Sequence, residues 1–232
     1  VHDISVYTNW DKDSVRMGFE EANNLFYIMT NSRALTVAQT TKAHKEIAAV
    51  VDEVSKETGK EYIFISRSDS TLRGHYPLET QLLKDDYVKN TGIQIDGEIL
   101  CPFFKEGGRF TINNIHYVKY GDELLPANET EFAKDKTFGY TAATMPEYVE
   151  EKSKGEYKAA DVTCISLEDI RNLNIDKIEE QLMNVKNFNK VIVNAVDYVD
   201  IKVFCVALYR AMAKGKIFMM RTAAGIVQVM GG

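Results

Sequence analysis

Apolar positions recur along the chain with the periods of strands and helices in alternation. From Thr36 to Thr58, apolar residues fall on one face of a helix and charged residues lie opposite, and Gly59 follows as a stop signal. Apolar runs at Leu25–Thr30 and Tyr62–Ser66 flank this helix and predict strands, the first of them buried on both faces. A strand, helix, strand succession of this kind indicates a parallel sheet with right-handed crossovers.

The same periods predict the remaining elements. Further strands are expected at Val1–Thr8, Glu98–Pro102, Thr111–Tyr117, Val162–Ser166, Val191–Ala195 and Ile217–Met220. A tight turn is expected within Thr111–Tyr117 at Asn113 and Asn114, because asparagine tolerates positive φ. Further helices are expected from Asp13, at Pro77–Val88, at Met145–Lys152, from Asp176 and at Asp200–Lys214. Tyr120–Ala127 is predicted as a loop, and Glu129–Tyr140 as an irregular excursion that folds over the sheet edge or over the site. The expected fold is a doubly wound, Rossmann-like α/β domain with a mainly parallel sheet.

Composition narrows the class of protein. With 232 residues, of which 45% are hydrophobic, the chain is long enough for one large domain spanning residues 1–232. A net charge of -6 without a block of basic residues argues against a nucleic-acid partner. No apolar run reaches the roughly 20 residues that a membrane span needs, and no export signal is present. We therefore expect a cytoplasmic protein.

The cysteines indicate a reducing compartment, and the histidines do not indicate a metal site. Cys101, Cys164 and Cys205 lie far apart in apolar segments, which predicts unpaired thiols in a reducing compartment. The four histidines share no short spacing with cysteines or carboxylates, so no metal site is predicted.

The chemistry is concentrated where the Tyr62–Ser66 strand gives way to the next helix. Five residues of this turn are candidate ligand contacts, namely Asp69, Ser70, Thr71, Arg73 and Gly74. The carboxyl ends of parallel strands open onto the binding crevice, and a helix N-terminus there offers free N–H groups. Arg73 could bind a carboxylate bidentately while Asp69 accepts from sugar hydroxyls, so the pattern indicates a small, anionic, hydroxylated ligand.

Other readings of the same turn remain open. Asp69 and Ser70 could simply cap the turn, with Arg73 in a surface ion pair. His75 could act as the base of a sugar-phosphate isomerase or hydrolase, or have a structural role at the helix start. No catalytic residue is assigned.

Arginines also follow other predicted strands. Arg33 comes after Thr30, Arg109 follows a glycine pair, and Arg221 closes the last predicted strand. We expect the turns after Thr30, Ser66 and Met220 to converge on one side of a single sheet, which would bring these arginines toward one anion site.

Four segments carry a resemblance to a known family. Ser68–Glu79 resembles the D-S-T-L-R-G signature of the four-carbon acid sugar kinases, and Pro102–Val118, Glu129–Gly139 and Arg221–Gly225 resemble later segments of the same domain. The likeness spans nearly the whole chain. It implies the N-terminal sugar-binding domain of an ATP-dependent kinase that phosphorylates a sugar acid of the threonate, erythronate or oxo-tetronate type.

The resemblance also has implications for cofactors and partners. An aspartate-rich turn that precedes this region in the family is not in the sequence, so we expect a domain truncated at its start. ATP and Mg²⁺ are expected to bind mainly to a C-terminal domain that this chain lacks, which agrees with the absence of a G-x-x-x-x-G-K-[ST] phosphate cradle. The fragment alone is then expected to be inactive. The expected partners are a small sugar acid and a second copy of the chain, with no nucleic acid and no membrane.

Some relatives carry the label of type III effectors. A non-catalytic sugar-acid-binding or effector protein on the same fold is therefore the alternative.

Overall fold

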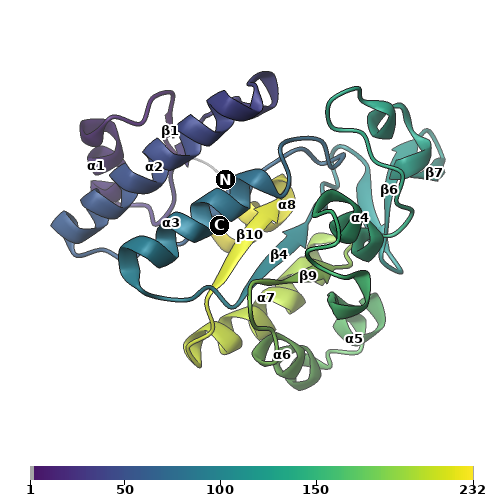
Figure 1. The fold of residues 1–232 in the computed structure, drawn as a ribbon. Coiled ribbons are helices and arrows are strands. Elements are labelled where there is room, and N and C mark those ends of the chain that lie inside the picture. The colour runs from purple at the N-terminus through teal and green to yellow at the C-terminus, as the bar shows by residue number, and fades with distance from the viewer. Residues whose placement is uncertain (1–2, 232) are drawn as a thin grey trace.

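The computed structural model of the protein describes residues 3–231, and a five-stranded parallel sheet forms its centre (Figure 1). The strands lie in the order β3 (Ile65–Arg67), β10 (Phe218–Thr222), β4 (Gly97–Cys101), β9 (Asn189–Val193) and β8 (Thr163–Ile165). All neighbouring pairs are parallel, so the carboxyl ends of the strands share one edge. The predicted α/β class is confirmed.

Helices cover both faces of this sheet. The helices are α1 (Lys12–Glu20), α2 (Val37–Thr58), α3 (Leu78–Thr91), α4 (Met145–Lys152), α5 (Leu167–Arg171), α6 (Ile175–Met183), α7 (Tyr198–Ala213) and α8 (Ala224–Gly231). Alternate strand residues point to opposite faces. Met219 of β10 packs with α2 and α3, whereas its neighbour Met220 belongs to the largest cluster, with α6, α7 and α8.

Local signals in the sequence explain where several elements begin and end. Thr36 caps α2 in a reciprocal capping box with Gln39, and α2 ends at Gly59 with φ of 68°. The turn between β5 (Arg109–Ile112) and β6 (Ile115–Tyr120) is made by Asn113 and Asn114, both with positive φ. These predictions are confirmed.

The prediction of a single sheet is wrong at the N-terminal side. β1 (Val6–Tyr7) and β2 (Tyr27–Ile28) form a separate two-stranded parallel sheet. β2 is also only half-buried, because it meets one partner strand and packs against α1 and α2. The strand predicted at Val1–Thr8 includes residues 1 and 2, which lie outside the described residues.

The prediction of a loop at Tyr120–Ala127 is also wrong. β7 (Glu123–Pro126) pairs with β6, and β5, β6 and β7 form an antiparallel sheet that projects from one end of the molecule (Figure 1). The strand was missed because its apolar part is only two residues long. Two helices, α5 and α8, were not predicted either.

The excursion contains short 3₁₀ turns, η2 (Ala127–Glu129) and η3 (Glu131–Lys134), while η1 (Ser32–Ala34) follows β2 and η4 (Ala159–Asp161) precedes β8. Within residues 3–231, no helix is long and apolar enough to cross a membrane. All three cysteines are free, as predicted, and burial raises the pKa of Cys101 and Cys205 to about 12.

A fully buried ion pair joins two strands of the main sheet. Glu98 of β4 and Lys190 of β9 are cross-strand neighbours, with Nζ 2.7 Å from the carboxylate and both side chains 0% exposed. The ammonium also lies 3.6 Å from the ring centre of Phe188 and 4.0 Å from that of Tyr157. Burial lowers the pKa of Lys190, and the Glu98 carboxylate opposes that shift. The carboxylate and the two rings balance the charge of a cation that has no access to water, although its ammonium has no hydrogen-bond partner among the described residues.

Lys190→Met should therefore destabilise the protein by about 3–5 kcal/mol, because Glu98 is left buried and unpaired. The double variant Glu98→Leu/Lys190→Met should recover most of that loss. Lys42→Met, which breaks an exposed contact of 3.8 Å with Glu46, serves as the control and should change the free energy of unfolding by less than about 1 kcal/mol. Denaturant unfolding measures all three. If Lys190→Met were as stable as the unchanged protein, the pair would not be desolvated.

Candidate functional site

The turn that follows β3 lies at the carboxyl edge of the main sheet. It is tied to the neighbouring strand by the Ser68 amide, which donates to the Thr222 carbonyl at 2.7 Å. Leu72 and Gly74 both have positive φ, at 68° and 124°. A Cβ at Gly74 would lie 2.9 Å from the Arg221 guanidinium, so glycine is needed there both for its backbone and for space.

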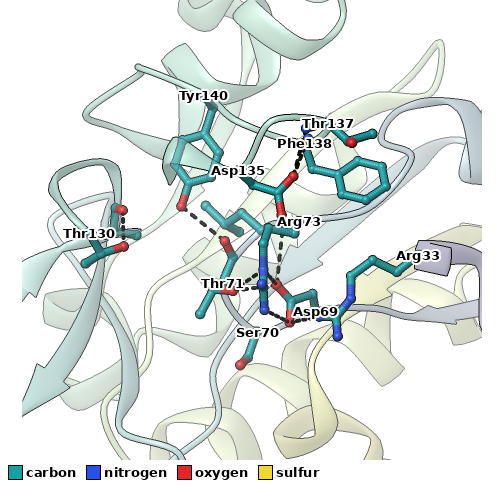
Figure 2. Close-up of polar contacts among 12 residues, drawn as sticks. Arg33, Asp69, Ser70, Thr71, Arg73, Thr130, Asp135, Thr137, Phe138 and Tyr140 are labelled. Atoms are coloured by element: carbon teal, nitrogen blue, oxygen red, sulfur yellow. Dashed lines mark hydrogen bonds and ion pairs between the residues drawn. The ribbon is translucent and has the colours of Figure 1, made fainter. Parts of the chain in front are cut away.

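Asp69 lies between two arginines from different segments (Figure 2). Arg73 donates from Nε to the Asp69 carboxylate at 2.8 Å, and Arg33 of η1 donates from Nη1 at 3.1 Å. Thr71 also donates its hydroxyl to the same carboxylate. Burial alone would raise the pKa of Asp69, but the hydrogen bonds from Arg73 and Thr71 outweigh burial and hold it below the usual range. Asp69 is thus an anion that anchors two cations.

Two of the predicted side chains meet although their strands lie in different sheets. Arg33 follows β2 of the small sheet, and Asp69 follows β3 of the main sheet. The oxygens of Asp69 are occupied by donors from the protein, so the expected bond to sugar hydroxyls would require one of these donors to move.

A third arginine approaches from the antiparallel sheet. The guanidinium carbons of Arg73 and Arg109 lie 4.9 Å and 5.5 Å from the centre of the Phe132 ring, which belongs to η3. Arg109 donates from Nη1 to the Gly107 carbonyl, and its buried Nε has no partner among the described residues. The excursion therefore folds over the site and places an aromatic ring between two cations.

Three consecutive carbonyl groups of the turn accept hydrogen bonds from side chains of other elements. His116 of β6 donates from Nε2 to Ser70 at 2.7 Å, Tyr140 donates to Thr71 at 3.1 Å, and Tyr148 of α4 donates to Leu72 at 2.8 Å. Figure 2 shows the Tyr140 bond, and it shows the Ser70 hydroxyl pointing away from Arg73. The backbone of the turn is thus fixed from three directions.

Sequence reasoning missed these three donors. His116 lies within Pro102–Val118, a segment that carries the family resemblance, but it was given no role of its own. A partner that donates to a backbone carbonyl leaves no pattern in the acceptor's sequence, so only the fold reveals it.

Arg221 was proposed as an anion contact, and the structure places it differently. Its side chain is 5% exposed, donates from Nη1 to Glu79 at 2.9 Å, and lies over the Tyr76 ring. Its Nη2 has no partner and faces Gly74. Arg221 therefore forms the buried floor of the site, where its charge is balanced by Glu79.

Glu79 also bears on phosphate binding. It lies in the first turn of α3, where a nucleotide phosphate would approach a helix N-terminus, and its carboxylate is buried. Burial alone would raise the pKa of Glu79, but Arg221 and Ser32 outweigh burial and lower it. Because Glu79 and Arg221 neutralise each other, the pair adds no net positive charge to this helix start for a nucleotide phosphate. Within residues 3–231, no group of three or more histidine, cysteine or carboxylate side chains could hold a metal ion.

A groove of about 620 Å³ lies elsewhere, between residues 8–11 and α2. Asp11, Glu46 and Glu53 line it together with Trp10, and none of the site arginines does. Its carboxylates would repel an anion.

These observations define an α/β domain with a cluster of arginines at the carboxyl edge of its sheet. Residues 2–230 match the family model described as "Sugar-binding N-terminal domain". The chain belongs to this family, the sugar-binding part of the four-carbon acid sugar kinases. A search of curated proteins gives no significant match.

Solved structures share the fold at low sequence identity. A Haemophilus influenzae protein of the family DUF1537 has a TM-score of 0.61 at 16% identity, over 98% of this chain and 55% of that chain. A Bordetella bronchiseptica domain of the same family, solved with bound citrate as a domain-swapped dimer, has a TM-score of 0.58 at 18% identity, over 98% and 56%. A Salmonella typhimurium protein described as a putative tRNA synthase has a TM-score of 0.62 at 10% identity, over 98% and 54%. The chain thus spans little more than half the length of these structures.

The burial of His116 makes the stability depend on pH. Burial lowers the pKa of His116 from 6.5 to about 4. Between these values the unfolded chain binds more protons than the folded chain, so this contribution is full above pH 6.5 and is lost as the pH falls toward 4. From pH 7 to pH 5, His116 should cost about 2 kcal/mol of unfolding free energy.

Urea unfolding at both pH values measures this loss. His116→Gln keeps a donor for Ser70 but does not titrate, so its loss between pH 7 and pH 5 should be smaller by about 2 kcal/mol. Equal losses in the two proteins would show that His116 does not titrate in this range.

Proposed function

We propose that this chain is the sugar-acid-binding domain of an ATP-dependent kinase that phosphorylates a four-carbon sugar acid. The observation that carries the proposal is the sharing of one carboxylate, Asp69, by two arginines. Arg33 and Arg73 together bring two positive charges to one negative charge, and Arg109 adds a third positive charge beside them. Asp135 and Glu131 lie close enough to act electrostatically on these arginines and offset part of the positive charge. The guanidinium groups of Arg33 and Arg73 nevertheless retain N–H donors for the carboxylate of a small anion.

The family and its structural neighbours support this class of ligand. The family model is a sugar-binding domain, and the Bordetella bronchiseptica neighbour holds citrate, a small carboxylate. A four-carbon aldonate combines a carboxylate with hydroxyl groups, and the carboxylate matches the guanidinium groups of Arg33 and Arg73. Asp69 then acts mainly by orienting the two arginines.

The kinase part of the proposal places ATP and Mg²⁺ on a further domain, since the pair of Glu79 and Arg221 adds no net positive charge to the helix start beside this site. Phosphoryl transfer depends mostly on positioning and charge stabilisation, so this domain would contribute by holding the sugar acid in one orientation. A homo-oligomer is part of the proposal as well, and the domain-swapped dimer of the neighbour agrees with it.

The binding part is tested by calorimetry on this chain with erythronate, threonate and the neutral polyol erythritol. The aldonates should bind, more weakly at high salt, and erythritol should bind about tenfold to hundredfold more weakly because it has no carboxylate. Equal affinity for erythritol and erythronate would contradict an anion site.

Arg73→Lys keeps the positive charge but loses the planar fork that holds Asp69 and faces the ligand. It should weaken aldonate binding about tenfold to hundredfold, or about 1.5–3 kcal/mol. The control is Arg210→Lys on α7, where Arg210 forms an exposed pair with Asp176. This variant should bind the aldonate as tightly as the unchanged protein does. Thermal melting separates a loss of binding from a loss of fold. An Arg73→Lys variant with unchanged affinity would exclude Arg73 as the carboxylate contact.

The kinase part is tested separately, in a protein that joins this chain to a nucleotide-binding domain. ADP release from ATP and Mg²⁺ should depend on the aldonate, and Arg73→Lys should lower kcat/KM. Binding without any phosphorylation would support the alternative of a non-catalytic sugar-acid-binding protein.

A further inference from the structure

The turn that carries Arg33 has little structure of its own. Arg33 lies in η1, a single 3₁₀ turn of residues 32–34, and its side chain is 53% exposed. The strand before it, β2, contributes only two ladder residues. A short turn after a short strand does not hold a long arginine side chain in one place, so other contacts must fix it.

His75 provides such contacts from the next segment of the site. The histidine is 7% exposed, and its Nε2 lies 3.1 Å from the Ser32 carbonyl oxygen and 2.9 Å from that of Leu35. Both carbonyls are acceptors, so Nε2 must carry a proton and donate to them. These two carbonyls stand on either side of Arg33 in the sequence.

Two further contacts hold the histidine and the turn. The Phe138 ring meets the His75 ring edge-on, with centroids 4.8 Å apart. Glu79, in the first turn of α3, accepts a hydrogen bond from the Ser32 hydroxyl. Since Asp69 accepts from Arg33 itself at 3.1 Å, the turn and the arginine are both attached to the stretch 69–79.

We propose that His75 is a positioning residue, which holds the η1 turn so that Arg33 addresses the ligand of the proposed sugar-acid site. Nε2 itself is not available as a base in this arrangement, because it donates to two backbone carbonyls. The inference rests on the proposed function for the ligand, but the contact it describes exists without ligand.

Two substitutions separate the donor from the ring. His75→Phe keeps a ring for Phe138 but loses the N–H group, and His75→Gln keeps an N–H group at a similar reach but loses the ring. His75→Phe should weaken erythronate binding by about fivefold to twentyfold, and His75→Gln should stay within about twofold of the unchanged protein.

The decisive comparison is a double-mutant cycle with Arg33→Gln. Arg33→Gln should weaken erythronate binding by itself, and adding His75→Phe should then cause no further loss, because His75 acts only through Arg33. Full additivity of the two losses, or an unchanged affinity of His75→Phe, would overturn the role of His75 while leaving the sugar-acid site in place. An unchanged affinity of Arg33→Gln would remove Arg33 from the site and overturn the inference.

Amide hydrogen exchange tests the same contact without ligand. The amides of Ala34 and Leu35 donate to Asn31 and Ser32 within the turn. In His75→Phe they should exchange at least about tenfold faster, while in His75→Gln they should exchange as in the unchanged protein. The exchange of α7 amides serves as the internal control. Unchanged exchange of Ala34 and Leu35 in His75→Phe would overturn the inference even if no aldonate bound at all.

Discussion

The site depends on one half-buried carboxylate that two arginines share. Asp69 is only 16% exposed, and without Arg33 and Arg73 its charge would be costly at that depth. Conversely, the two guanidinium groups would repel each other without Asp69 between them. Asp69, Arg33 and Arg73 therefore require one another. A ligand with one carboxylate meets donors that are already oriented, so little ordering is needed when it binds.

The surrounding elements are arranged to keep that carboxylate in place. Three neighbouring carbonyls of the turn accept from His116, Tyr140 and Tyr148, which come from the antiparallel sheet, the excursion and α4. Beneath the turn, the buried pair of Glu79 and Arg221 joins α3 to β10. The antiparallel sheet, the excursion and α4 thus stabilise the turn, because they donate hydrogen bonds to carbonyl groups that the turn itself leaves without partners.

The sequence predicted those parts of the structure in which local signals and burial agree. The helix α2 has a capping box, a regular apolar face and a terminal glycine, and it was placed within a residue. The turn from Asp69 to Gly74 was found because polar residues follow an apolar strand. The strand predicted at Leu25–Thr30 is present but shortens to the two residues of β2. The strand β7 could not be predicted, since it owes its conformation to its partner strand β6 and not to its own residues.

The sequence predicted several residues of the candidate site, but it did not predict which of them contact one another. Arg33 and Arg73 were named, but their common partner Asp69 was assigned to the ligand. Arg221 was named as a ligand contact although Glu79, which balances its charge, lies far away in sequence and was not considered. Contacts between distant segments decide which charges remain for a ligand, and the sequence alone does not show these contacts.

The most direct measurement is a crystal structure of this chain with erythronate. The account predicts that the carboxylate of the ligand lies within hydrogen-bond distance of Arg33 or Arg73, at the carboxyl edge of the main sheet, with Asp69 still bonded to at least one of them. A ligand bound in the groove beside Trp10, or bound at the edge without contact to either arginine, would contradict the account.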